Sequence, residues 1–223
     1  MAVSESTRSA GLGFLAGYVD TLIFIALFGL FTAHVTGNFV LIGRALARPT
    51  HDVLLKLLVF PVFLLAVALT RVLVLRWQRV DSGAGVAGHA LRNCLALQLA
   101  LLLGGTLCGW LATPIDNPDA PLVLAAGMLC AAAMAVQNAY AKLLMGKAAA
   151  TTVMTGNVTQ LVIELVDAGR GESGALERCG KLLWPVLAFG AGCISGAFAF
   201  ILAGFGGLLL PCAILLALMV SAE

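Results

Sequence analysis

The sequence predicts an all-α integral membrane protein, with about six transmembrane helices arranged as a 3+3 inverted-topology repeat. The first observation is composition: of 223 residues, 61% are hydrophobic and 11% are charged, and the mean hydropathy is +1.04. A soluble domain of this length cannot bury so much apolar surface in one core. The second observation is a series of long apolar runs, and the third is a short motif that occurs once in each half of the chain. Such a duplication indicates two copies of one unit.

The apolar runs give the predicted spans in order. Five of them approach or exceed the roughly 20 residues that a spanning helix needs. They cover residues 12–31, 53–75, 91–112, 121–144 and 182–203. A sixth run, 206–220, is short, and Gly204-Phe205-Gly206-Gly207 in front of it predicts a tight turn. The chain is thus predicted to be one polytopic domain over residues 1–223, with repeat 1 at about residues 11–112 and repeat 2 at about 121–221.

The duplicated motif is Thr36-Gly37-Asn38, which returns as Thr155-Gly156-Asn157. The polar residue Asp20 lies upstream of the first copy, and Asn138 lies at about the corresponding position upstream of the second. If each copy holds three crossings, the second copy enters the membrane from the side opposite to the first. The repeat is therefore inverted, as is typical of secondary transporters and some channels, whose site lies near the midplane where the copies meet.

Each motif precedes an apolar stretch, 39–47 and 158–166, that is too short to cross the hydrocarbon. These stretches predict a broken or half-helix after the first helix of each repeat. The glycines allow unusual backbone angles, the Thr and Asn side chains can cap the helix that follows, and a helix amino terminus attracts anions. Ordinary capped turns at the membrane interface explain the same pattern, and the residues do not decide between the two.

Isolated polar residues in the spans are the next candidates, because a polar group in the membrane usually faces a partner or a cavity. Asp20 either titrates during transport or satisfies a neighbour, Arg71 or His34. His34 acts either as a proton switch or as a hydrogen-bond donor to the backbone. Glu164 shares one helical face with Gln160. The candidate proton or charge relay is Asp20, His34, Arg71 and Glu164.

Basic residues set the predicted orientation. They gather after the second and fourth spans, whereas residues 113–120 contain none. Placing the arginine-rich loop in the cytoplasm puts both termini there as well. Arg44, Arg48 and Lys56 would then lie outside, which argues against this orientation. The residues that favour it are Arg71, Arg76, Arg79, Arg92, Lys142 and Lys147.

Three glycine pairs spaced four residues apart predict close helix packing. Most such pairs pack within a chain, and a homo-oligomer through one of these faces is left open. The pairs are Gly13 with Gly17, Gly105 with Gly109, and Gly192 with Gly196.

Other functional classes have little support in the sequence. The histidines are scattered and no Cys-x-x-Cys spacing exists, so we expect no metal. We also expect no cofactor and no nucleic-acid partner. No nucleophile and base stand at a catalytic spacing, so we expect no enzymatic activity.

The residues resemble a known family. Gly17-Tyr18-Val19-Asp20, the following apolar run, Thr36-Gly37-Asn38, Gln137-Asn138 and the second Thr-Gly-Asn together resemble the YoaK-like family of bacterial inner-membrane proteins, classed as domain of unknown function 1275. The resemblance covers nearly the whole chain. It implies a multi-pass protein of the bacterial inner (cytoplasmic) membrane, and it implies no particular substrate or activity.

The sequence thus predicts a transporter or channel for an unidentified small solute. The predicted partners are that solute and the lipid bilayer. A non-transporting assembly or sensor subunit is the alternative, with glycine faces turned outward and no polar cavity between the repeats; a membrane enzyme is a weaker one. The predicted substrate-binding residues are Thr36, Gly37, Asn38, Thr155, Gly156, Asn157, Asp20 and Asn138.

Overall fold

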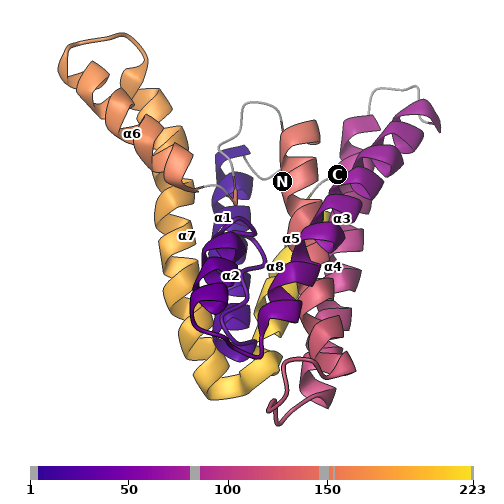
Figure 1. The fold of residues 1–223 in the computed structure, drawn as a ribbon. Coiled ribbons are helices and arrows are strands. Elements are labelled where there is room, and N and C mark those ends of the chain that lie inside the picture. The colour runs from indigo at the N-terminus through magenta and orange to yellow at the C-terminus, as the bar shows by residue number, and fades with distance from the viewer. Residues whose placement is uncertain (1–4, 81–85, 146–150, 153, 222–223) are drawn as a thin grey trace.

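A computed structural model describes residues 5–80, 86–145, 151–152 and 154–221 (Figure 1). These residues form helices and contain no strand, so the all-α class is confirmed. The predicted orientation concerns the chain ends, the loop after the second span and Lys147. The ends, part of that loop and Lys147 lie outside the described residues. The helices are α1 (Glu5–Ala26), α2 (Gly37–Ala47), α3 (Val53–Val80), α4 (Val86–Leu111), α5 (Pro121–Leu144), α6 (Met154–Gly169), α7 (Ala175–Ala203), the 3-10 helix η1 (Gly204–Leu208) and α8 (Leu209–Val220).

Five segments of the described chain are long and apolar enough to cross a membrane. The sixth crossing that the sequence predicted corresponds to α8, which is shorter than these five segments. It has 12 residues, and a helix of that length extends only about 18 Å. It joins α7 through η1, where the sequence predicted a turn. The five segments are Ser6–Ala26, Val53–Arg79, Gly88–Leu111, Pro121–Leu144 and Ala175–Val220.

The first helix ends earlier than predicted. It stops at Ala26 rather than at Phe31, because the chain turns at Phe28 and Gly29, both of which have positive φ, 51° and 78°. Glycine accepts this conformation without steric cost. The Gly29 amide donates to the carbonyl of Phe24 at 2.9 Å, closing the end of the helix. Ten residues, 27–36, therefore separate the end of α1 from the start of α2 at Gly37.

Figure 1 shows how the helices are arranged. The helices α1 and α5 lie in the middle of the bundle; α1 packs against α7, while α5 packs against α4 and α3. The short helix α2 lies towards the lower end in this view, whereas α6 lies at the upper end beside the start of α7. The core follows the central helices, where Leu15, Leu22 and Met134 are fully buried.

The crossing of α1 and α7 depends on glycines from both helices. A Cβ at Gly17 would lie 2.3 Å from the carbonyl oxygen of Phe189, and one at Gly196 would lie 2.3 Å from that of Tyr18. Gly13 and Gly192 face the opposite backbone in the same way. These two glycine pairs therefore pack against each other, which brings two backbones into van der Waals contact.

The third glycine pair also faces inward. Gly105 lies against Cys130 of α5, and Gly109 lies against the ring of Phe205 in η1. All three faces that the sequence suggested for a homo-oligomer are thus occupied by helices of the same chain.

A buried network of amides joins the helices that support the centre. Tyr140 donates to Oε1 of Gln98 at 2.8 Å, and Nε2 of Gln98 donates to Oε1 of Gln137 at 2.8 Å. Nε2 of Gln137 then donates to the carbonyl oxygen of Leu12 at 2.9 Å and to Oγ1 of Thr151 at 3.2 Å. The network connects α4, α5 and α1 with the segment before α6.

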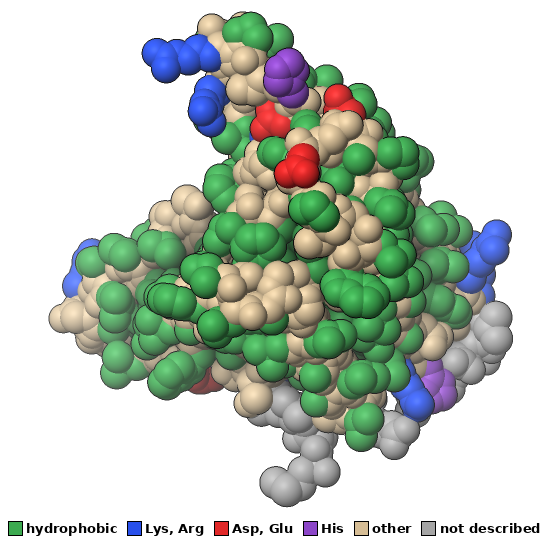
Figure 2. Space-filling model, turned by 90° about the horizontal axis from the view of Figure 1, so that it is seen from below, with side chains coloured by type: hydrophobic (Ala, Val, Ile, Leu, Met, Phe, Trp, Pro, Cys, Tyr) green, Lys and Arg blue, Asp and Glu red, His purple; other side chains and the backbone are tan. Residues whose placement is uncertain are grey.

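The outer surface is strongly apolar. Leu64, Leu65 and Leu69 of α3 are more than half exposed, as are Ile201 and Leu202 of α7. Figure 2 shows hydrophobic side chains over most of the face seen from below, with few charged ones. Water would make such a surface costly, whereas lipid accommodates it.

Candidate functional site

The segment between α1 and α2 is held by Asp20. Its Oδ1 accepts hydrogen bonds from the amides of Thr32 and Ala33, both at 2.7 Å, and its Oδ2 lies 2.8 Å from Nδ1 of His34. Asp20 is 4% exposed, so its charge is balanced by these donors rather than by water. Of the two partners that the sequence offered, the structure gives His34. Arg71 is exposed on α3.

Asn38 fixes the same segment from the other end. Nδ2 of this fully buried side chain donates to the carbonyls of Phe31 and Val35, at 2.8 and 3.1 Å, and its Oδ1 accepts from the amide of Phe31 at 3.1 Å. A side chain that pairs with both polar groups of one residue imitates a β-strand partner. Asn38 therefore fastens the loop and does not cap the helix.

The capping role predicted for Thr36 is wrong. Thr36 stands at the N-cap position of α2, but its side chain makes no capping hydrogen bond. The amides of Gly37, Asn38 and Phe39 donate instead to the carbonyls of the residues three before them, at 2.8, 3.0 and 3.2 Å. Because these amides are already paired, they are not available to bind an anion. The Thr36 hydroxyl makes no hydrogen bond to the start of the helix.

The glycines of the two motifs do not serve the backbone role that the sequence predicted. Neither Gly37 nor Gly156 has a positive φ. At Gly37 the reason is space, since a Cβ would lie 2.8 Å from the ring of Phe31. A Cβ at Gly156 would meet nothing within 4 Å.

The second motif lies inside a helix rather than in front of one. Because α6 begins at Met154, Thr155, Gly156 and Asn157 form its first turn and cannot cap it from outside. Asn157 is buried, and its Nδ2 lies 3.5 Å from the sulfur of Met154. The capping prediction is therefore wrong for this copy as well.

The segment before α6 is held by α5, as the segment before α2 is held by α1. Nδ2 of Asn138 donates to Oγ1 of Thr152 at 2.9 Å. The neighbouring Gln137 donates to Thr151. Asp20 and Asn138, which the sequence matched across the repeat, thus both bind the segment that leads into the next short helix.

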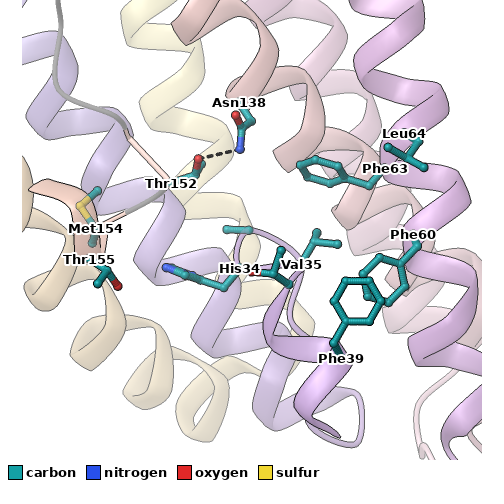
Figure 3. Close-up of a pocket in the computed structure, with 12 residues that line it drawn as sticks. His34, Val35, Phe39, Phe60, Phe63, Leu64, Asn138, Thr152, Met154 and Thr155 are labelled. Carbon is teal, nitrogen blue, oxygen red and sulfur yellow. Dashed lines mark hydrogen bonds between the residues drawn. The ribbon is translucent and has the colours of Figure 1, made fainter. Parts of the chain in front are cut away.

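Between these segments lies a cavity of about 480 Å³ (Figure 3). Thr36 of the first motif and Thr155 of the second both line it. Asn138 and His34 line it too, and Figure 3 shows the imidazole pointing towards the side where Met154 and Thr155 lie. The described residues that line it are Ala33, His34, Val35, Thr36, Phe39, Phe60, Phe63, Leu64, Asn138, Thr152, Met154 and Thr155.

The remaining predicted site residues stand behind the lining. Gly37, Asn38, Gly156 and Asn157 do not line the cavity, although each belongs to a segment that does. Asp20 of α1 binds His34 from behind the lining, and Asn38 fastens the loop that carries Thr36. The aromatic and aliphatic residues of the lining were not predicted.

Glu164 lies outside the cavity. Its Oε2 accepts from Nε of Arg178 at 2.7 Å, and its Oε1 accepts from Nε2 of Gln160 at 2.9 Å. The hydrogen bond from Arg178 lowers the pKa of the Glu164 carboxyl. This ion pair joins α6, which is not among the membrane spans, to the start of α7. We assign it to helix packing rather than to the relay.

No group of three or more His, Cys, Asp or Glu side chains that could hold a metal ion occurs in the described part of the chain. The polar side chains among the described lining residues carry hydroxyls, one amide and one imidazole. They can donate and accept hydrogen bonds, and the imidazole can exchange a proton.

Long apolar spans around a partly polar cavity define a multi-pass α-helical membrane protein. The chain belongs to the family described as protein of unknown function (DUF1275), whose sequence profile matches residues 9–221. This confirms the resemblance that the paired Thr-Gly-Asn motifs indicated. No curated protein and no solved structure matches the chain.

Proposed function

We propose that this protein is a transporter or channel for a small solute, and that the solute binds in the cavity between the two Thr-Gly-Asn motifs. The observation that carries this proposal is that Thr36 and Thr155, from opposite halves of the chain, line the same cavity. Its volume of about 480 Å³ falls within the roughly 300–1,000 Å³ usual for small-molecule sites.

The proposal includes the 3+3 inverted repeat. In support, α1, α2 and α3 form the series long helix, short helix and long helix with an internal proline, Pro61, and α5, α6 and α7 form the same series with Pro185. The packing of α1 on α7 corresponds to that of α5 on α3. The short helices α2 and α6 lie towards opposite ends of the bundle, as inversion requires (Figure 1).

We place the protein in the bacterial inner membrane with both termini in the cytoplasm. The basic residues after the second and fourth spans support this orientation. One of the residues that argued against it, Lys56, is 3% exposed and pairs with Asp52 and with the carbonyl of Phe28. Since its charge is neutralised inside the protein, Lys56 counts less as a charge of the external loop.

The pair Asp20 and His34 is our candidate for proton coupling. His34 is one-third exposed towards the cavity, while the buried Asp20 behind it holds the segment between α1 and α2. Phe189 of α7 packs edge-on against the imidazole at 5.2 Å, and Cys193 of α7 is the titratable group that lies near Asp20. A proton taken up from the cavity would therefore change the charge of the pair that fastens this segment.

The alternative of a non-transporting assembly or sensor subunit is less well supported. That function predicted glycine faces turned outward and no polar cavity between the repeats. Gly17, Gly105 and Gly196 face helices of the same chain, and the cavity carries hydroxyl, amide and imidazole groups. Both observations favour transport, and we propose no chemical reaction in the cavity.

Solute flux into proteoliposomes tests the proposal. Osmotic swelling would be followed by stopped-flow light scattering with amino acids, organic acids, nucleobases, sugars and inorganic anions. We expect one class to enter faster than into protein-free liposomes, and we expect Thr155→Trp, which fills the cavity, to abolish that entry. Thr159→Trp, one turn further along α6 on an exposed position, is the matched control. Equal flux in both variants would exclude a route through the cavity.

A further inference from the structure

The two walls of the cavity differ in chemistry. Phe39, Phe60, Phe63 and Leu64, from α2 and α3, form one wall, and the rings of Phe39 and Phe60 stack with centroids 4.0 Å apart. Asn138, Thr152 and Thr155 lie across from them, on the side of α5 and α6 (Figure 3). A solute in this cavity meets flat apolar surface on one side and hydrogen-bonding groups on the other.

Among the residues that the structure describes, the lining contains no Lys, Arg, Asp or Glu. Asp20 stands behind His34, and both of its oxygens are engaged by Thr32, Ala33 and His34. While His34 is neutral, a fully charged solute would lose its hydration without gaining a counter-charge, which is costly in an apolar surrounding. The cavity therefore favours uncharged solutes over anions.

The polar wall offers donors and acceptors together. Nδ2 of Asn138 is engaged with Oγ1 of Thr152, which leaves the amide oxygen of Asn138 as an acceptor and the Thr152 hydroxyl hydrogen as a donor. The hydroxyl of Thr155 adds a group of either kind. His34 is bound through Nδ1 and has Nε2 left for a solute. Such a neutral set matches an edge that carries both N–H and C=O.

We propose that the cavity binds an uncharged, flat ring solute with an amide-like edge, the ring against the Phe39–Phe63 wall and the edge against Asn138 and Thr155. Aromatic faces prefer such stacked or edge-on contacts, which add to the burial of apolar area. This inference rests on the proposed function, since it names the class of solute for the same cavity.

The test uses three probes that separate ring, edge and charge. Nicotinamide has the ring and the neutral amide, nicotinate has the same ring with a negative charge, and acetamide has the amide without the ring. The melting temperature of the detergent-purified protein is measured against the concentration of each probe, because a ligand of the native state raises it. We expect nicotinamide to raise it by about 2–4 °C, and nicotinate and acetamide to leave it unchanged.

Variants locate the binding. Phe63→Leu removes the flat wall and Asn138→Leu removes the polar edge, and each is expected to abolish the shift with nicotinamide. Phe198→Leu, on the exposed surface of α7, is the matched control and should keep it. Melting without a probe shows whether each variant is folded. A shift that persists in both cavity variants would place the binding elsewhere and overturn the inference.

Failure of this inference differs from failure of the proposed function. If nicotinate or acetamide stabilises the protein as much as nicotinamide does, the solute class is wrong. The same holds if nicotinamide gives no shift while a sugar, an amino acid or an inorganic anion gives one that Thr155→Trp abolishes; the proposed site then stands. If no probe of any class shifts the melting temperature or enters proteoliposomes, both are overturned.

Discussion

Asp20 and Asn138 make corresponding contacts in the two halves of the chain, but only Asp20 carries a charge. Oδ1 of Asp20 accepts from the amide of Thr32 at 2.7 Å, and Nδ2 of Asn138 donates to Oγ1 of Thr152 at 2.9 Å. Each bond fastens the segment that leads from a long helix to a short one. Protonation can therefore weaken the attachment of the first segment while it leaves that of the second unchanged.

Replacement of Asp20 separates its structural role from its charge. Asp20→Ala leaves the buried amides of Thr32 and Ala33 without an acceptor, and we expect a loss of about 2–5 kcal/mol in the free energy of unfolding. Asp20→Asn keeps an acceptor oxygen and should cost less than half as much. Unfolding of the detergent-solubilised protein by added denaturing detergent measures both. Equal losses would show that the carboxylate does not act through these two amides.

His34 is expected to control the pH dependence of flux. His34→Gln keeps a polar side chain facing the cavity and removes the imidazole, which can exchange a proton. We expect the variant to transport solute at a rate that no longer varies with pH. Proteoliposome swelling at several pH values is the measurement, with Thr159→Trp as a variant that keeps the pair of Asp20 and His34. An unchanged pH profile in His34→Gln would exclude this histidine as the proton site.

Gly196→Ala is expected to destabilise the crossing of α1 and α7. The added Cβ would lie 2.3 Å from the carbonyl oxygen of Tyr18, so the helices must separate. We expect a cost of about 1–3 kcal/mol, typical of overpacking. Gly190→Ala on the same helix is the matched control, since a Cβ there meets nothing within 4 Å. Thermal melting compares the two, and equal melting temperatures would mean that the crossing tolerates a wider spacing.

Acid is expected to loosen α6 through Glu164. The hydrogen bond from Arg178 lowers the pKa of this carboxyl, so the folded state favours the charged form. The stabilisation is complete above the ordinary pKa of a glutamate, about 4.3, and it is lost as the pH falls through the lowered value. The melting temperature should therefore decline more steeply below about pH 4.3 in the natural protein than in Glu164→Gln. Parallel curves would assign the acid sensitivity to other carboxyls.

The long helices could be predicted because crossing a bilayer requires a minimum length of apolar chain. The extent of α5, Pro121–Leu144, agrees with the apolar run from which it was predicted. The end of α1 could not be predicted, because the turn at Phe28 and Gly29 lies within an apolar run that continues to Phe31. The sixth run, 206–220, is visibly short in the sequence, but its composition is as apolar as that of a spanning helix and therefore predicted a crossing, whereas α8 has 12 residues.

For the site, the repeated motif singled out Thr36 and Thr155, and both line one cavity. The motif also predicted that Asn38 caps α2, which was wrong. Whether such an Asn caps the helix or fastens the loop depends on where the helix begins, to within one or two residues. Nothing in the sequence indicated that Phe60 and Phe63 would form a wall of the cavity. In a chain that is 61% hydrophobic, an aromatic side chain facing a cavity has the same sequence context as one facing lipid.

We expect the length of α7 to make the cavity sensitive to the surrounding lipids. Its apolar part, residues 182–203, extends about 33 Å, whereas the hydrocarbon of a bilayer is about 30 Å thick. A helix too long for its bilayer tilts, and a thinner bilayer increases the tilt. The salt bridge between Glu164 and Arg178 couples α6 to the first turn of α7. Because the other end of α6 carries Thr155 into the cavity wall, we expect acyl-chain length to alter the shape of the proposed binding site.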